Sequence, residues 1–312
     1  MVKPSPDERR PRWLARTAGV GLAIGLAATA PARAADPVDA AGTPAAGAHL
    51  PGKMVFAALV TPDLVAAERF YTNLFRWQFQ NAYVGRMLVG EATLDGRVVS
   101  AIVQRPMQDG QRPAWRTFLS SADVDNSVVT AVQQGAKVLV PPHDLAAIGR
   151  DALLTDPQGA VFGIMATASG DPPDVLPAPG GWIWSSLLTT DPKTDAGFYK
   201  AVFGFDTFDT AAPGDPAHVI LASGTFARAS VNPLPGDHPN AHPRWISYVR
   251  VADIQAAVAS ATGLGARVVV PAHEDRNGGT IAVLADPAGA LFGLLAWSDD
   301  QVTPDAGAGD AK

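Results

Sequence analysis

Apolar and polar residues follow one another in a pattern that predicts the same βαβββ unit four times. Residues 53–61 alternate as a half-buried strand does, and behind Asp63 the apolar residues recur at helical spacing up to Phe75. Three short strand patterns follow within residues 77–104. The same order begins again at Trp115, Ile183 and Trp245. The pattern therefore predicts an α+β fold of four modules, in which an Asp caps each helix: Asp63, Asp123, Asp191 and Asp253.

A nine-residue segment indicates that the modules are paired into two copies. Residues 156–164 return as residues 286–294, with six of the nine positions identical. The same offset of 130 residues relates Trp115 to Trp245. Self-similarity this regular predicts a duplication, with two modules in each copy.

The domain organisation follows from the two copies and the segments around them. The predicted domains span residues 52–168 and 182–297, and residues 169–181 join them as a stiff linker with four prolines. Residues 35–51 and 298–312 are rich in Ala, Pro, Gly and Asp, which is typical of disordered flanks.

Residues 1–34 predict a signal peptide. Arg9 and Arg10 belong to a basic segment, a short apolar run with glycines follows, and Ala32-Arg33-Ala34 fits the small-x-small cleavage pattern. The arginine pair and the weakly apolar run resemble a twin-arginine signal, from which Pro11-Arg12 departs. We therefore expect an exported protein, periplasmic or secreted. The apolar run is too short for a transmembrane helix, so no stable membrane insertion is expected.

Composition excludes several kinds of chemistry. The chain has no cysteine, which excludes disulfides, thiolate catalysis and thiolate metal ligands. Its formal net charge is −6, and loss of residues 1–34, with six basic and two acidic residues, makes it −10. This charge argues against a nucleic-acid partner. The duplication is consistent with a monomer that contains an internal pseudo-dimer.

Two motifs occur in both copies with matched spacing. In the first, a capping Asp precedes a Phe-Tyr pair by seven residues, as in Asp63 with Phe70-Tyr71 and Asp191 with Phe198-Tyr199. The second is Asp-Pro-x-Gly-Ala, which begins at Asp156 and Asp286. These motifs resemble the vicinal oxygen chelate superfamily, which includes glyoxalases, bleomycin-resistance proteins and extradiol dioxygenases. The resemblance covers residues 52–297 and implies two tandem domains, each with a curled sheet around a cup for metal or ligand.

One position departs from the family pattern. Arg76 follows the first helix where the family, and the second copy at Gly204, has glycine. Glycine ends helices there because it adopts positive φ freely. Arg76 therefore predicts a locally altered turn.

The resemblance also implies metal-ligand positions, and this chain lacks ligands there. Family metal enzymes place His, Gln or Glu seven residues before the capping Asp, and Glu in the last strand of a module. The first positions hold Phe56, Arg116, Trp184 and Ile246. The second hold Gly163 and Gly293, with the other two near Ala101 and between Arg228 and Ser230. We therefore expect no metal and no cofactor, which argues against metal-dependent glyoxalase or dioxygenase activity.

The histidines do not restore a metal site. His143 and His273 are expected just after strands, before loops. His238 and His242 are predicted to be turn residues, because Pro239 and Pro243 exclude a helix between them.

Strand alternation selects the side chains expected to face the cups. The predicted ligand-binding residues are Phe56, Arg116, Phe118, Trp184, Tyr248 and Arg250, and Trp182 and Ser186 are expected to share the face of Trp184. Aromatic side chains suit a planar organic ligand, and guanidinium groups suit a carboxylate or phosphate. The alternatives are core packing for the aromatic residues and surface ion pairs for the arginines. No catalytic residue is predicted; Glu91 is a candidate base, with an exposed hairpin carboxylate as its alternative.

Three functions remain open. The first is metal-independent binding of a small aromatic or anionic molecule, with sequestration of a toxic compound as one version. The second is a lyase or isomerase that uses a cup residue such as Glu91 or Arg116. The third is a protein-interaction module with degenerate cups. Fold alone does not decide among them.

Overall fold

A computed structural model describes residues 47–145, 148–234, 241–276 and 278–297. The predicted signal peptide, most of the segment 35–51, the tail 298–312 and His238 lie outside this part of the chain. None of the described helices is long and apolar enough to cross a membrane.

The first copy begins with a strand and a helix, as the apolar pattern predicts, and repeats that order once. Its elements are β1 (Met54–Thr61), α1 (Leu64–Phe75), β2 (Gln78–Val84), β3 (Met87–Leu94), β4 (Arg97–Gln104), β5 (Ala114–Ser120), α2 (Val124–Gln133), β6 (Lys137–Leu145), β7 (Gly149–Thr155) and β8 (Val161–Thr167).

The second copy has the same order of elements. They are β9 (Trp182–Thr189), α3 (Pro192–Phe203), β10 (Asp206–Asp209), β11 (Val219–Ser223), β12 (Phe226–Pro233), β13 (Arg244–Val251), α4 (Ile254–Gly263), β14 (Arg267–Glu274), β15 (Thr280–Ala285) and β16 (Leu291–Ala296).

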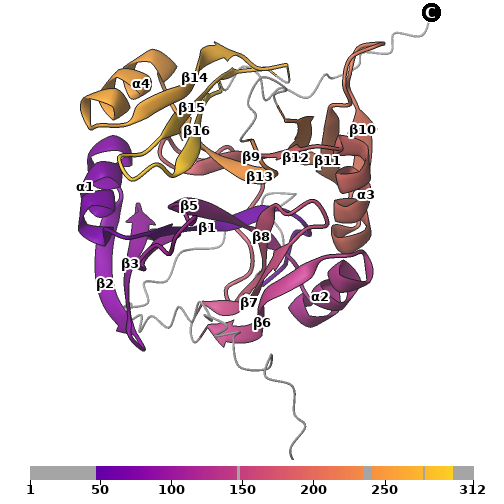
Figure 1. The fold of residues 1–312 in the computed structure, drawn as a ribbon, viewed down its shortest axis with the longest axis horizontal. Helices are drawn as coiled ribbons and strands as arrows, with labels where there is room; N and C mark the ends of the chain where they lie inside the picture. Colours follow the sequence, from indigo (N-terminus) through magenta and orange to yellow (C-terminus); the bar gives the residue numbers. More distant parts are fainter. Residues whose placement is uncertain (1–46, 146–147, 235–240, 277, 298–312) are drawn as a thin grey trace, which may run out of the picture.

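Each copy folds into one eight-stranded sheet built from its two modules. The strand orders are β2-β3-β4-β1-β5-β8-β7-β6 and β10-β11-β12-β9-β13-β16-β15-β14. The first strands of the two modules, β1 with β5 and β9 with β13, pair antiparallel at the centre of each sheet. The predicted α+β fold of tandem domains is therefore confirmed, with two curled sheets (Figure 1).

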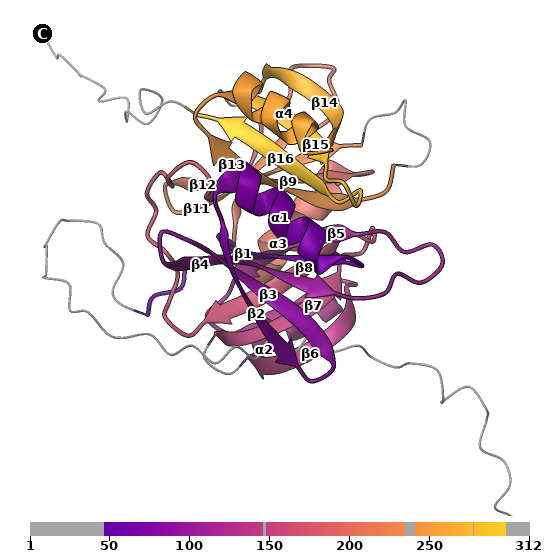
Figure 2. The same ribbon diagram turned by 90° about the vertical axis from the view of Figure 1, so that its left-hand side faces the viewer.

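The helices pack across the boundary between the two copies. Helix α2 contacts α3, and α1 contacts α4 (Figures 1 and 2). One large apolar cluster accordingly joins the second and third modules, and another joins the first and fourth. The helix-covered faces of the two sheets thus pack together in these two cores. The opposite face of each sheet, which forms the cup, carries a smaller apolar cluster.

Residues that repeat in the sequence form a hydrogen-bonded connection between the copies. Trp115 Nε1 donates to the hydroxyl of Tyr71 at 2.8 Å, and that hydroxyl donates to Asp286 Oδ2 of the other copy at 2.9 Å. The second oxygen, Asp286 Oδ1, accepts the backbone N–H groups of Ala288 and Ala290 within its own turn. We call this set the Asp286 clasp.

A second clasp relates to the first by the internal symmetry. Trp245 donates to Tyr199 at 2.8 Å, and Tyr199 donates to Asp156 at 3.1 Å. Between the clasps the hydroxyl oxygens of Thr117 on β5 and Ser247 on β13 lie 2.8 Å apart. Because each clasp joins residues of both copies, the Phe-Tyr and Asp-Pro motifs stabilise the pairing of the domains.

The four predicted helix caps are confirmed. Each capping Asp accepts the backbone N–H three residues later, which satisfies one of the donors left free at a helix start. The acceptors are Asp63, Asp123, Asp191 and Asp253.

The altered turn predicted at Arg76 is wrong. Arg76 adopts φ 62° and ψ 23°, while Gly204 adopts φ 74° and ψ 24°, so the two turns have the same backbone. Both cap N–H groups bond the carbonyl four residues back, Thr72 and Lys200. The hydrogen bond holds the left-handed conformation, and Arg76 takes on a strain of about 1 kcal/mol that glycine avoids.

The expected ends of two strands are also wrong. Strands β6 and β14 continue through Pro141-Pro142 and Pro271 and include His143 and His273. Both are edge strands with register shifts in this region. An edge strand tolerates proline, because no neighbouring strand needs the missing N–H on its outer side.

Candidate functional site

At two positions where the family has a metal-binding Glu, aromatic rings occupy the space. Gly163 pairs with Phe118 and Gly293 pairs with Tyr248 on neighbouring strands. A Cβ atom on Gly163 would lie 2.1 Å from Cδ1 of Phe118, and one on Gly293 would lie 2.1 Å from Cδ1 of Tyr248. Each ring therefore covers its glycine and leaves no room for a longer side chain.

The positions that would complete a metal site hold other aromatic residues. The Phe56 ring lies 5.8 Å from that of Phe118 in an edge-to-face arrangement, and Trp184 pairs with Tyr248 in register. These residues offer no imidazole or carboxylate to a divalent ion, so they do not fit a metal centre. In the part of the chain that the structure describes, no group of three or more His, Cys, Asp or Glu is placed to hold a metal.

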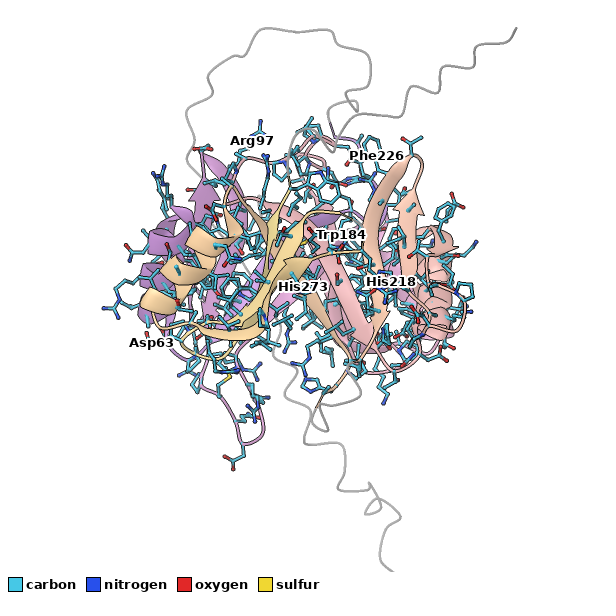
Figure 3. All side chains as sticks on the ribbon, turned by 90° about the horizontal axis from the view of Figure 1, so that it is seen from above. Asp63, Arg97, Trp184, His218, Phe226 and His273 are labelled. Atoms are coloured by element: carbon cyan, nitrogen blue, oxygen red, sulfur yellow. The ribbon has the colours of Figure 1, made fainter. Side chains whose placement is uncertain are left out.

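The second cup contains a cavity of about 460 Å³. Its wall is mostly apolar and aromatic. The apolar lining includes Trp182, Ile183, Trp184, Ile220, Phe226, Tyr248, Ile281, Leu295 and Trp297. Figure 3 shows Trp184 within the second domain and Phe226 at the end of a hairpin. A cavity of this size with large aromatic walls suits a small organic ligand.

A short polar ladder lies behind the cavity wall and connects Trp184, Ser186 and Asn232 through Ser230. Ser186 Oγ and Ser230 Oγ lie 2.8 Å apart, and Trp184 Nε1 donates to Ser230 Oγ at 3.3 Å. Asn232 Nδ2 donates to the same oxygen at 3.2 Å, and the Asn232 side chain also bonds the His218 imidazole. Burial raises the pKa of Tyr248 to about 12, so its hydroxyl, within reach of Ser186, stays protonated. The wall of the cavity thus offers a neutral hydroxyl.

The interdomain linker covers part of the cavity. Residues 174–177 line it, and Arg228 binds Asp174 through Nη1 at 2.5 Å and Nη2 at 2.9 Å. Lys53 Nζ bonds Asp174 Oδ1 and the carbonyl oxygens of Pro172 and Pro173. Burial opposes ionisation of Asp174, but the hydrogen bonds from Arg228 and Lys53 hold its pKa below the usual value. The two cations therefore fix the linker over the cup.

The predicted ligand-binding residues fall in four places, and Arg250 occupies the fourth, at the linker. Trp184 and Tyr248 lie together in the cavity. Phe56 and Phe118 pack in the first cup with Val89, Leu145 and Met165, in an apolar cluster. Arg116 lies on the same strand as Phe118 but lines a groove at the end of the sheets, together with Ile246 of the second copy. The structure therefore separates the first-copy residues from the second-copy pair.

Arg250 and Trp182 have contacts that strand alternation does not predict. Arg250 Nη1 donates to the carbonyl oxygen of Pro177 at 2.8 Å and thus holds the linker. Trp182 is expected on the cup face, but its Nε1 donates to Val99 O of the first copy and its ring packs against Trp77 and Trp115. A register shift between Tyr248 and Val249 turns this end of β9, so Trp182 reaches the domain boundary while bordering the cavity.

Other residues of the cavity are absent from the sequence-based set. Strand alternation along β12 places Arg228, Ser230 and Asn232 on one face, and this signal could have identified them. The linker residues carry no comparable signal, because their position depends on contacts with Lys53 and Arg228. Glu91 is half-buried on β3 opposite Ala101 in the first copy, and burial raises its pKa.

Comparison with known proteins identifies the family. Residues 185–295 match the glyoxalase-like domain family. The chain is 33% identical over 243 residues to "Putative glyoxylase CFP32" of Mycobacterium tuberculosis, covering 76% of this chain and 92% of that protein. This chain belongs to the glyoxalase-like family of the vicinal oxygen chelate superfamily. It is also 30% identical over 267 residues to "Anthracycline biosynthesis protein DauV" of Streptomyces sp. (strain C5), covering 78% of this chain and 93% of that protein.

Solved structures of this superfamily share the fold. The Mn(II)-bound glyoxalase from Novosphingobium aromaticivorans aligns with a TM-score of 0.58 at 16% identity, covering 79% of this chain and 82% of that chain. The 2,3-dioxygenase LapB from Pseudomonas sp. KL28 aligns with a TM-score of 0.59 at 12% identity, covering 80% and 93%. At these identities the likeness concerns architecture alone.

Proposed function

We propose that this glyoxalase-like protein binds a small, planar aromatic molecule in the second cup without a metal. One observation carries the proposal: the Tyr248 ring covers Gly293 and faces a 460 Å³ cavity beside Trp184, in the cup where the family resemblance implies a ligand. Large rigid aromatic side chains bind planar ligands with little loss of conformational freedom. The polar ladder behind them would orient the ligand through the Tyr248 hydroxyl.

The names of two relatives support an aromatic ligand. Two Streptomyces proteins at 30% identity are named for anthracycline biosynthesis. Anthracyclines contain a planar polycyclic ring system, the chemistry that Trp184 and Tyr248 would contact.

The two cations of the lining, Lys53 and Arg228, are paired with Asp174. The lining also contains Asp275. The cavity therefore favours a neutral ligand with hydroxyl or carbonyl groups over an anionic one.

Replacing Trp184 by alanine is expected to weaken binding of 1,8-dihydroxyanthraquinone, a neutral planar probe, by about 30-fold. A well-buried aromatic contact is typically worth roughly 2 kcal/mol, and 1.4 kcal/mol corresponds to a tenfold change in affinity. Isothermal titration calorimetry on the purified protein measures the effect, with circular dichroism to verify folding.

The first cup provides a matched control. Phe56 occupies the position equivalent to Trp184, and its Leu variant should bind the probe like the parent. Equal affinity of the Trp184→Ala variant and the parent would place the site elsewhere. Stoichiometric manganese, iron, nickel or zinc that remains after dialysis would contradict metal-free binding.

We also propose export through the twin-arginine route, which the residues of the first 34 positions support. Changing Arg9-Arg10 to Lys-Lys should retain the protein in the cytoplasm of the producing cell, since that route reads the arginine pair. Fractionation of cells followed by immunodetection measures the distribution. Undiminished export of the Lys-Lys variant would point to the general secretory route.

A further inference from the structure

A second, larger depression lies where the two copies meet, away from the second cup. It has a volume of about 870 Å³ and is lined by both domains. From the first copy it takes the end of β1, the first residue of β3, the connector between β4 and β5, the start of β5, and parts of β6 to β8. From the second it takes residues 242–246, Gly289 and Leu291. We call this depression the seam groove.

Four arginines line the seam groove without an acidic residue among the described lining. They are Arg105, Arg112, Arg116 and Arg244. The chain as a whole is acidic, with a formal net charge of −6. The positive charge of the groove is therefore a local feature, opposite in sign to the net charge of the protein. Such a surface attracts anions.

Two of these arginines are held partly out of water at the centre of the groove. Arg116 makes no hydrogen bond or ion pair within the described residues, and burial lowers its pKa. Burial, and then the neighbouring Arg112, lower the pKa of Arg244, which donates to His242 O at 3.1 Å. Both groups remain cations, because arginine is not deprotonated in proteins. Arg112 and Arg244 are thus like charges near enough to affect each other, and partly buried cations of this kind favour an anionic ligand as counter-ion.

The internal symmetry does not account for this charge. Arg116 corresponds to Ile246 in the second copy, and Arg244 corresponds to Ala114 in the first, at the 130-residue offset. Each copy thus contributes one guanidinium from its central strand, at positions where the other copy is apolar. The duplicated fold itself does not require these arginines.

The rest of the groove is apolar. Val60, Met87, Val140, Leu153 and Leu291 form part of its wall, and Val138 and Leu139 are 40% and 44% exposed. An inorganic anion would leave this wall in water. An apolar chain or ring attached to an anionic head would cover it, which stabilises the complex in proportion to the buried area.

We propose that the seam groove binds an amphiphilic organic anion, with its carboxylate held by the arginines of the lining and its apolar body along the wall. This site is separate from the aromatic site of the second cup, and neither proposal depends on the other. Pairing with guanidinium groups gives charge-assisted hydrogen bonds, which are about twice as strong as neutral ones.

Calorimetric titration with decanoate tests the proposal, with acetate as the head alone and decan-1-ol as the tail alone. We expect decanoate to bind at least tenfold more tightly than either. The double variant Arg116→Leu/Arg244→Leu should lose at least tenfold in decanoate affinity. The milder Arg244→Gln should lose about threefold, which keeps the test valid if the double variant unfolds.

Two control variants separate the seam groove from other sites. Arg97→Leu removes an exposed arginine at the opposite end of β1 and β4 from the groove, and it should bind decanoate like the parent. Arg97 and Asp63, which follows β1, lie on opposite sides of the molecule in Figure 3. Trp184→Ala should also keep decanoate affinity. The proposal is overturned if Trp184→Ala abolishes decanoate binding, if the arginine variants bind like the parent, or if decan-1-ol binds as tightly as decanoate.

Discussion

Replacing Asp286 by alanine is expected to lower the free energy of unfolding by about 3–4 kcal/mol. The Asp286 carboxylate is 4% exposed and accepts the Tyr71 hydroxyl and two backbone N–H groups. Alanine would leave these donors buried without acceptors, and each such group costs about 1–3 kcal/mol. Denaturant unfolding followed by circular dichroism measures the change.

The direction of the hydrogen bonds in the Asp286 clasp shows that a second variant, Tyr71→Phe, tests the link between the copies alone. An indole N–H can only donate, so Trp115 requires the Tyr71 oxygen as its acceptor, and the Tyr71 proton must point to Asp286. Tyr71→Phe removes the link between the copies but leaves the turn around Asp286 intact. It should cost about 1–2 kcal/mol, less than Asp286→Ala.

A helix cap offers a control of the same residue type. Asp253→Ala removes an exposed cap bond to Ala256 and should cost about 1 kcal/mol. If Asp286→Ala costs no more than Asp253→Ala, the clasp does not stabilise the pairing of the domains.

The clasps show what the sequence predicts well and what it leaves open. Trp115, Tyr71 and Asp286 stand out as repeated positions, and their repetition correctly predicts a duplication. Their spacing says nothing about which copy supplies the partner of each. From the sequence, Tyr71 is predicted to be a core residue on the buried face of its helix. Apolar periodicity predicts that a residue is buried, but not which element of the other copy it contacts.

In the second cup, too, the sequence predicts some side-chain positions and not others. Alternation along β9 and β13 correctly places Trp184 and Tyr248 on one face, because a regular strand points every second side chain in one direction. Trp182 departs from that rule at a register shift, which no residue pattern signals here. Arg250 serves the linker because Pro177 passes above it, a contact set by the path of the chain in space.

Replacing Gly293 by alanine is expected to lower the free energy of unfolding by about 2–3 kcal/mol. The added methyl group would lie 2.1 Å from Cδ1 of Tyr248 and 2.5 Å from Cγ, so the root of the side chain, and not only the far end of the ring, would have to shift. Overpacking of this kind typically costs 1–3 kcal/mol. Gly197→Ala on α3 is the matched control: a Cβ there meets nothing within 4 Å, so that variant should be as stable as the parent or up to about 1 kcal/mol more stable.

The Tyr248→Ala background tests whether the ring is the cause. Removal of the ring should abolish most of the cost of Gly293→Ala, so that the double variant is more stable than the sum of the single effects predicts. An unchanged cost would mean that the backbone, and not Tyr248, excludes the side chain. The Cβ atom is the first atom that any metal-binding Glu at this position would need. Tyr248 would therefore have to be replaced by a smaller residue before position 293 could carry a metal-binding Glu. A tyrosine at position 248 and a metal ligand at position 293 thus exclude each other.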